Sequence, residues 1–186
     1  MKQIIQLSLL VTLAFIFTTE SRAALLLEPV VGYNIGYKLD VDTDEKYTDG
    51  SGTAFGGRVG YQNFGLQLGL DYLNSSIDMD DADIDDNISL TEWAGFIGYE
   101  FPVLLRVYAG YIFSAAGSTE SNGNDWDLIE GSGTKLGVGF TGLPFIDINV
   151  EYRAGSFDNY EINGTKQNKE VNYQSIMLGL SLPFTI

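Results

Sequence analysis

Beyond its N-terminal segment, the chain alternates between apolar and polar positions with a period of two, and no stretch keeps a helical spacing. The alternation is clearest in PFIDINVEYRA (144–154), where Ile146 and Ile148 share one parity while Asp147 and Glu151 share the other. Successive side chains of a strand point to opposite faces of a sheet. The pattern therefore predicts β-strands along the whole chain, each with an apolar face and a polar face.

The alternating segments predict eight strands joined by two kinds of connection. The strands lie near residues 25–38, 53–62, 64–74, 88–100, 102–115, 129–141, 144–156 and 171–186. Three connections are tight, at 62–64, 100–102 and 141–144, and four are long and polar, at 40–52, 75–87, 118–127 and 158–169. Tight hairpins at one end and long loops at the other predict an up-and-down meander with both termini at the tight end. We expect an all-β fold, a closed eight-stranded antiparallel barrel, because an even strand number lets the first and last strands pair and removes the exposed edges.

Charged residues and glycines gather on the polar face. The charged residues are Glu28, Arg58, Asp71, Glu92, Arg106, Lys135, Asp147, Glu151 and Arg153. The glycines are Gly32, Gly36, Gly56, Gly60, Gly65, Gly69, Gly98, Gly110, Gly131, Gly133, Gly137, Gly139 and Gly179. A strand glycine weakens the strand, so a solvated face has little reason to use so many, whereas the narrow interior of an eight-stranded barrel does. The near balance of acids and bases also suits a confined interior, where an unpaired charge is costly. We therefore expect these charges to form a network inside the barrel.

The apolar face is then on the outside, where it is expected to contact lipid. Its clearest members are Leu66, Leu68, Leu70, Leu105, Val107, Ile146, Ile148, Val150, Leu178 and Leu180. Aromatic residues flank them in two predicted bands. One band lies toward the tight turns (Tyr61, Phe64, Tyr99, Phe101, Phe140, Phe145, Phe184) and one toward the loops (Tyr37, Tyr72, Trp93, Phe113, Tyr152). Alternating strands of about 10 residues with aromatics at both borders are typical of transmembrane β-barrels. The alternative is an exported soluble barrel with the faces reversed, which would hold an apolar ligand inside.

The N-terminal segment is typical of a secretory signal peptide. Lys2 precedes an apolar run at 4–17, and Ser21-Arg22-Ala23 provides small residues at the usual cleavage positions. The run is shorter than the roughly 18 residues of a spanning helix. We predict a signal peptide at 1–23 and one barrel domain at 24–186. The chain has no cysteine, so the exported protein would use no disulfides.

The predicted barrel domain, 24–186, resembles over its whole length the small eight-stranded outer-membrane barrels of Gram-negative bacteria, of the type of OmpX and the OmpA membrane domain. The final strand, QSIMLGLSLPFTI, resembles the family's assembly signal, with apolar residues at every second position back from the C-terminus, although it ends in Ile186 and carries Pro183. The resemblance implies a monomer in the cell outer membrane, with periplasmic termini and extracellular loops. It also implies contacts with outer-membrane lipid and lipopolysaccharide, and with the assembly machinery through the C-terminal strand.

Composition narrows the functions that such a barrel could have. The chain has no histidine, which removes the usual general base and the commonest metal ligand, so we expect no catalytic residue and no cofactor. Its net charge of −15 argues against nucleic acid as a partner. The acidic stretches Asp40–Glu45 and Asp78–Asp86 are candidates for a divalent cation or a partner, although neither has the calcium-loop pattern and we assign no metal ligand. The expected role is structural or surface-exposed, and the alternative is a narrow pore.

Overall fold

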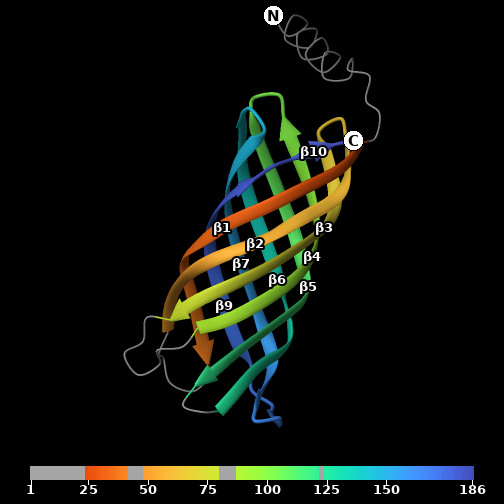
Figure 1. Cartoon of the computed structure of the whole chain (residues 1–186). Helices are drawn as coiled ribbons and strands as arrows, with labels where there is room; N and C mark the ends of the chain where they lie inside the picture. The colour runs from red at the N-terminus through yellow and green to blue at the C-terminus, as the bar shows by residue number, and fades with distance from the viewer. Residues whose placement is uncertain (1–23, 42–47, 80–86, 122–123) are drawn as a thin grey trace, which may run out of the picture.

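The computed structural model describes residues 24–41, 48–79, 87–121 and 124–186, which form a barrel of steeply tilted strands (Figure 1). The strands are β1 (Ala24–Val41), β2 (Thr48–Asn63), β3 (Leu66–Met79), β4 (Asn87–Phe101), β5 (Leu105–Ser121), β6 (Asn124–Leu143), β7 (Ile146–Ile162), β8 (Thr165–Gln167), β9 (Val171–Ser181) and β10 (Phe184–Thr185). In these residues, no helix is long and apolar enough to cross a membrane.

The barrel closes because β9 pairs antiparallel with both β7 and β1. Each strand from β1 to β7 also pairs antiparallel with the next, so β1 to β7 and β9 form a closed ring of eight. The two-residue strand β10 continues β9 after a break at Pro183 and pairs with β1. Proline cannot donate a ladder hydrogen bond, which explains the break. The predicted closed eight-stranded antiparallel barrel is confirmed.

Tight turns close one end of the barrel, which we call the turn end. The β2–β3 turn consists of Phe64 and Gly65, both with positive φ (51° and 79°), the conformation that a two-residue hairpin with the right-handed twist of its strands requires. Gly65 was predicted to lie on the interior face, and its place in the turn corrects that prediction. Both termini of the barrel also lie here, since Leu25 and Ile186 exchange backbone hydrogen bonds of 2.8 and 3.0 Å.

The opposite end, which we call the loop end, has more strand than the sequence pattern predicted. Most of the predicted connections 118–127 and 158–169 is strand, as the end of β5, the start of β6, and the hairpin of β7 with β8. Within the predicted connection 75–87, β3 continues to Met79, and residues 80–86 lie outside the described residues. Figure 1 shows β5 to β7 projecting further than β1 to β4. The extra length follows from continued pairing of β5 with β6 out to Ser121 and Asn124.

One aromatic residue lies on the other side of the wall from its predicted position. Tyr37 was assigned to the outer face, but it is buried in the interior, with 1% of its surface exposed. The ladders of β1 with both neighbours shift register between Asn34 and Tyr37. Such a bulge inserts one extra residue and moves every following side chain to the opposite face.

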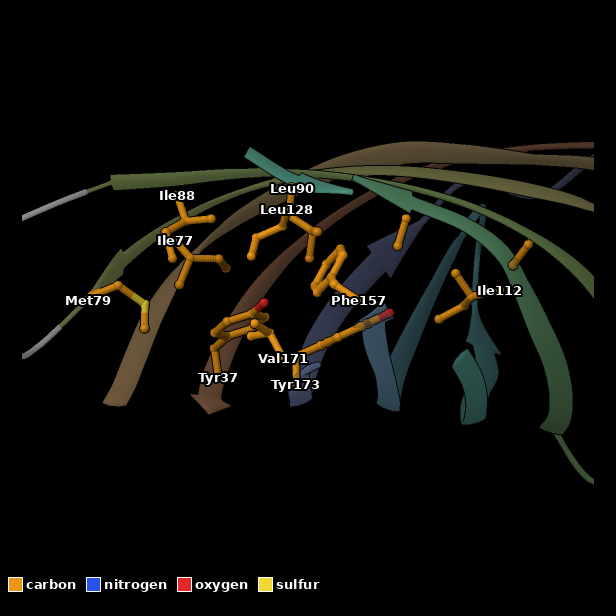
Figure 2. Close-up of a cluster of buried hydrophobic side chains, with 12 residues drawn as sticks. Tyr37, Ile77, Met79, Ile88, Leu90, Ile112, Leu128, Phe157, Val171 and Tyr173 are labelled. Carbon is orange, nitrogen blue, oxygen red and sulfur yellow. The ribbon is translucent and has the colours of Figure 1, made fainter. Parts of the chain in front are cut away.

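Toward the loop end, the pattern of faces inverts. An apolar layer fills the interior there, formed by Tyr37, Ile77, Met79, Ile88, Leu90, Ala94, Ile112, Ala115, Leu128, Phe157, Val171 and Tyr173 (Figure 2). Within it, the rings of Tyr37 and Phe157 pack against Tyr173 with centroid distances of 6.2 and 5.2 Å. The outer face of the same segments is polar, as Asn74, Ser76 and Asp78 on β3 illustrate. This end of the barrel thus has the arrangement of a water-soluble sheet.

Candidate functional site

The interior of the barrel nearer the turn end contains a network of charged side chains. The structure places all nine of the charged residues expected inside, each with 4% or less of its surface exposed: Glu28, Arg58, Asp71, Glu92, Arg106, Lys135, Asp147, Glu151 and Arg153. They come from β1 to β7, and their side chains converge because they share the inward parity of their strands. We call these nine residues the charged layer.

Arg58 is a hub of the charged layer. Its guanidinium contacts three carboxylates, with 2.8 Å from Nε to Asp71 Oδ2, 3.1 Å from Nη1 to Glu28 Oε1 and 2.9 Å from Nη2 to Glu151 Oε2. Asp71 is its cross-strand neighbour on β3, Glu28 its neighbour on β1, and Glu151 lies across the barrel on β7. The planar fork of arginine presents several donors at fixed angles, which suits a cation shared by several acids.

Arg106 extends the network toward the turn end. It donates two hydrogen bonds to Glu28, at 2.9 and 2.6 Å, and a third to Asn149 Oδ1 at 2.7 Å. Asn149 on β7 in turn donates to Ser181 Oγ on β9 at 2.8 Å. Asp147 lies 3.6 Å from Arg106 and is the most peripheral acid of the layer.

Glu151 connects the hub to the side of the layer that faces the loop end. It is fully buried and accepts from Arg58, from Arg153 Nε at 2.5 Å and from Lys135 Nζ at 3.5 Å. Arg153 also pairs with Glu92, and Lys135 with Asp71. Nine charges are therefore joined in one continuous set of ion pairs, which is the condition under which buried charges are tolerated.

Uncharged residues complete this network, although charge balance alone did not single them out. Tyr108 accepts a hydrogen bond from Arg58 at 3.0 Å, and its ring centroid lies 4.4 Å from the Arg58 guanidinium carbon. Tyr173 donates to Glu92 Oε1 at 2.6 Å and thereby joins the charged layer to the apolar layer. Both tyrosines share the parity of the charges, so the alternation of the sequence assigns them to the same polar face, although it does not identify their partners.

Interior glycines leave the space that these long side chains occupy. A Cβ added at Gly137 would lie 2.1 Å from Tyr108 Cζ, and one at Gly110 would lie 3.0 Å from Lys135 Cε. A Cβ added at Gly139 would lie 2.6 Å from Asn149 Oδ1. The glycines and the charged layer are thus two parts of one packing arrangement, since an eight-stranded barrel has no room for side chains from every position.

The outer face carries the ten apolar residues expected there. Each is at least 36% exposed: Leu66, Leu68, Leu70, Leu105, Val107, Ile146, Ile148, Val150, Leu178 and Leu180. Aromatic pairs lie at both borders of this apolar band. Toward the loop end, the rings of Tyr72 and Trp93 pack with a centroid distance of 4.8 Å. Toward the turn end, the rings of Tyr99 and Phe101 pack with the same centroid distance, 4.8 Å. A continuous exposed apolar band of this extent is far larger than the patches that water-soluble proteins tolerate.

The candidate cation sites fall mostly outside the described residues. Most of Asp40–Glu45 and Asp78–Asp86 lies in the segments 42–47 and 80–86. Within the parts of the chain that the structure describes, no group of three or more acidic, histidine or cysteine side chains could hold a metal ion. The carboxylates of the charged layer are all held in ion pairs with arginine or lysine.

Comparisons with known proteins agree with this architecture. The barrel superimposes on Neisserial surface protein A with a TM-score of 0.58 and 18% identity, over 86% of this chain and 97% of that one. It superimposes on Ail, the attachment invasion locus protein of Yersinia pestis, with a TM-score of 0.56 and 14% identity, over 86% and 98% of the two chains. At these identities the likeness shows the fold alone. No curated protein sequence matches the chain. Residues 8–184 match the model of the outer membrane protein beta-barrel domain, and the chain therefore belongs to this family of outer-membrane β-barrels.

Proposed function

We propose that this chain is a closed, non-conducting barrel that serves as a structural scaffold in the outer membrane and presents its loop end outside the cell. The observation that carries the proposal is the filling of the interior by two successive layers. The charged layer occupies the middle of the barrel and the turn end, and the apolar layer occupies the loop end. A permeating ion would have to break buried ion pairs and then cross a packed apolar layer, and both steps are costly.

The proposed orientation places the turn end in the periplasm and the loop end outside. Short turns on the periplasmic side and longer connections on the outside are the rule for barrels of this kind. The apolar band, with members such as Leu68 and Val150, would then contact lipid acyl chains, and the bordering aromatics would lie at the two interfaces. The final strand, including Leu178 and Leu180, would serve recognition by the assembly machinery.

Two alternatives fit the structure less well. A narrow pore would need a continuous aqueous path through the two filled layers. An exported soluble barrel would need its apolar face inside, whereas the ten apolar residues named above are exposed. Catalysis is also disfavoured, because the chain has no histidine and the buried carboxylates are paired with cations.

Conductance in planar lipid bilayers tests the proposal. We expect the purified, refolded protein to give no single-channel steps above those of the detergent control. The double variant Phe157→Gly and Tyr173→Ala removes two rings of the apolar layer. It should also remain non-conducting, because the charged layer still fills the barrel. A shift in gel mobility between unheated and heated samples verifies that each protein is folded. Reproducible steps from the folded wild type would contradict the proposal in favour of the pore.

A further inference from the structure

Each of the three tight turns at the turn end places a bulky apolar residue in the left-handed conformation. These residues are Phe64 with a φ of 51°, Leu104 with 61° and Phe145 with 67°. Residues other than glycine rarely adopt this conformation, and those that do are mostly asparagine and aspartate. The side chains are also exposed on the protein surface, Phe145 to 83% and Leu104 to 52%. The turns thus combine backbone strain with exposed apolar area, which water would not favour.

The loop end provides a matched turn for comparison. The β7–β8 turn consists of Asn163 and Gly164, with φ values of 50° and 74°. Phe64 and Gly65 have nearly the same values, 51° and 79°. Asn-Gly is the preferred pair for a two-residue turn of this kind. The same backbone geometry therefore carries the preferred polar residue at one end of the barrel and phenylalanine at the other, which indicates that the surroundings of the two turns differ.

The turn end continues the apolar band of the outer face. Its three turns, with the strand residues that flank them, carry no charged side chain and read NFGL (63–66), FPVLL (101–105) and TGLPFI (141–146). Figure 1 shows these turns together at the end of the barrel where the chain terminates. No polar border therefore separates the lipid-facing wall from the turns.

The polar side chains of this end lie in the mouth of the barrel. Gln67 is buried and donates to Gln62 at 3.2 Å, and Gln62 donates to Glu100 at 3.1 Å. Glu100 shares the inward side of its strand with Gly98 and is the cross-strand partner of the buried Arg106. The only charged groups near the turns therefore face the interior.

Neighbouring strands satisfy backbone groups of two of the turns. The Gly65 carbonyl accepts a hydrogen bond of 2.8 Å from the Glu100 amide, and the Leu104 carbonyl accepts one of 2.9 Å from the Thr141 amide. Water could supply such partners, whereas lipid could not, so a turn in lipid must be satisfied by the protein. These bonds make the turns compatible with an environment without water.

The height of the apolar band also requires the turns. On the β2–β3 hairpin, the outward apolar stretches cover residues 55–61 and 66–72, and the next outward residues are Thr53 and Asn74. Seven residues of a strand tilted by about 40° rise about 18 Å. The apolar band of a transmembrane barrel is about 25 Å tall. Phe64, below both stretches, extends the band toward that height.

We propose that the turn end is immersed in the leaflet that faces the periplasm, so that lipid rather than water covers its three tight turns. The membrane is the occupant of this surface because the surface is apolar, uncharged and continuous with the apolar band. The choice of leaflet rests on the proposed orientation, whereas the immersion does not. A soluble periplasmic partner would then find no water-exposed surface on these turns, and the loop end would be the end of the barrel that is available for contacts.

Thiol accessibility in lipid nanodiscs, which leave both faces of the membrane open to solvent, tests the proposal. The chain has no cysteine, so Phe64→Cys, Phe145→Cys and the matched loop-end control Asn163→Cys can each be labelled with a membrane-impermeant maleimide. Both turn-end variants should react about tenfold more slowly than the control, because the thiolate is the reactive form and apolar surroundings disfavour it. All three should react at equal rates in urea. Lipids with shorter acyl chains should raise the turn-end rates and leave the control unchanged.

Equal rates at the two ends in nanodiscs would place the turns in water and overturn the proposal. Slow labelling that does not respond to acyl-chain length, or that occurs only in discs with more than one copy, would show that protein covers the turns, and would also overturn it. The gel-mobility shift verifies folding, and the second turn-end variant serves if one fails to fold. Conductance of the wild type would contradict the proposed function and leave the labelling rates unaffected, so the two proposals fail separately.

Discussion

Glu151→Gln is the substitution that should most clearly show how much the charged layer contributes to stability. The change keeps the size of the side chain and removes one negative charge from a fully buried position that three cations share. The amide would also turn a donor toward either Arg58 or Arg153, which themselves only donate. One contact of two unit charges at 4 Å is worth about 4 kcal/mol at an effective dielectric constant of 20. Loss of one partner of a buried pair costs about 3–5 kcal/mol, and we expect the free energy of unfolding to fall by that amount.

Urea titration of the protein refolded into phospholipid vesicles measures this loss. Fluorescence of the two tryptophans, Trp126 and the outward-facing Trp93, reports the transition between the lipid-inserted and unfolded states. Glu170→Gln is the matched control, since Glu170 is exposed, and it should change the free energy of unfolding by less than about 0.5 kcal/mol. Arg58→Met should cost less in the Glu151→Gln background than in the wild type, because one of its three carboxylate partners is already gone. A cost of Glu151→Gln no larger than that of the control would refute the assignment of Glu151 as the connecting acid.

Three further predictions address the packing, the outer face and the loop end. Gly137→Ala should lower the free energy of unfolding by about 1–3 kcal/mol in the same titration, because its Cβ would displace Tyr108 from Arg58. Val150→Arg should cost about 2–4 kcal/mol, the penalty of a cation on the lipid face near the middle of the bilayer. At the loop end, a hydrogen bond of 3.0 Å from Lys166 lowers the pKa of the exposed Glu130. The stabilisation from this contact is present above the ordinary pKa of Glu130 and is lost as the pH falls through the lowered value. Amide hydrogen exchange in β8 should therefore accelerate on acidification. Glu130→Gln should remove this pH dependence.

Each of these predictions has a control and a contrary outcome. Gly95→Ala is the control for packing, since a Cβ there meets nothing within 4 Å. Thr53→Arg is the control for the lipid face, since it lies on the polar part of the outer wall of β2 and should cost about 0–1 kcal/mol. If Gly137→Ala and Gly95→Ala lowered the free energy of unfolding equally, the packing of Gly137 against Tyr108 would be contradicted. If Val150→Arg and Thr53→Arg lowered it equally, the placement of Val150 on the lipid face would be contradicted. Acid-dependent exchange in β8 that persists in Glu130→Gln would assign the effect to another group.

The barrel and its two faces were predictable because alternation with a period of two is a local property of the sequence. The residues of PFIDINVEYRA lie as their parity predicts, with Ile148 and Val150 exposed and Asp147 and Glu151 buried. The partners in the charged layer were not predictable, because Arg58 and Glu151 are far apart in sequence and meet only across the closed barrel. Strand register and shear decide such contacts, and neither can be read from one strand alone.

Two errors of the sequence-based prediction have local physical causes. Tyr37 continues an unbroken alternation in the sequence, and the bulge that moves it inside leaves no mark in that pattern. The segment around Ile77 was predicted to be a connection because serine and aspartate surround it. Those polar residues lie on the outer face of the strand, and the apolar residues between them point into the interior. At the loop end the outer face is therefore polar and the inner face apolar, the reverse of the arrangement nearer the turn end.

Spin labels on β7 test most directly the central claim that the outer face contacts lipid and that its character changes at the loop end. The chain has no cysteine, so single cysteines at positions 150 and 156 can be labelled separately in the refolded protein in vesicles. We predict that the label in place of Val150 is accessible to oxygen and shielded from a water-soluble nickel complex. The label in place of Ser156 should show the reverse. Nickel access at position 150 equal to that at position 156 would contradict the account.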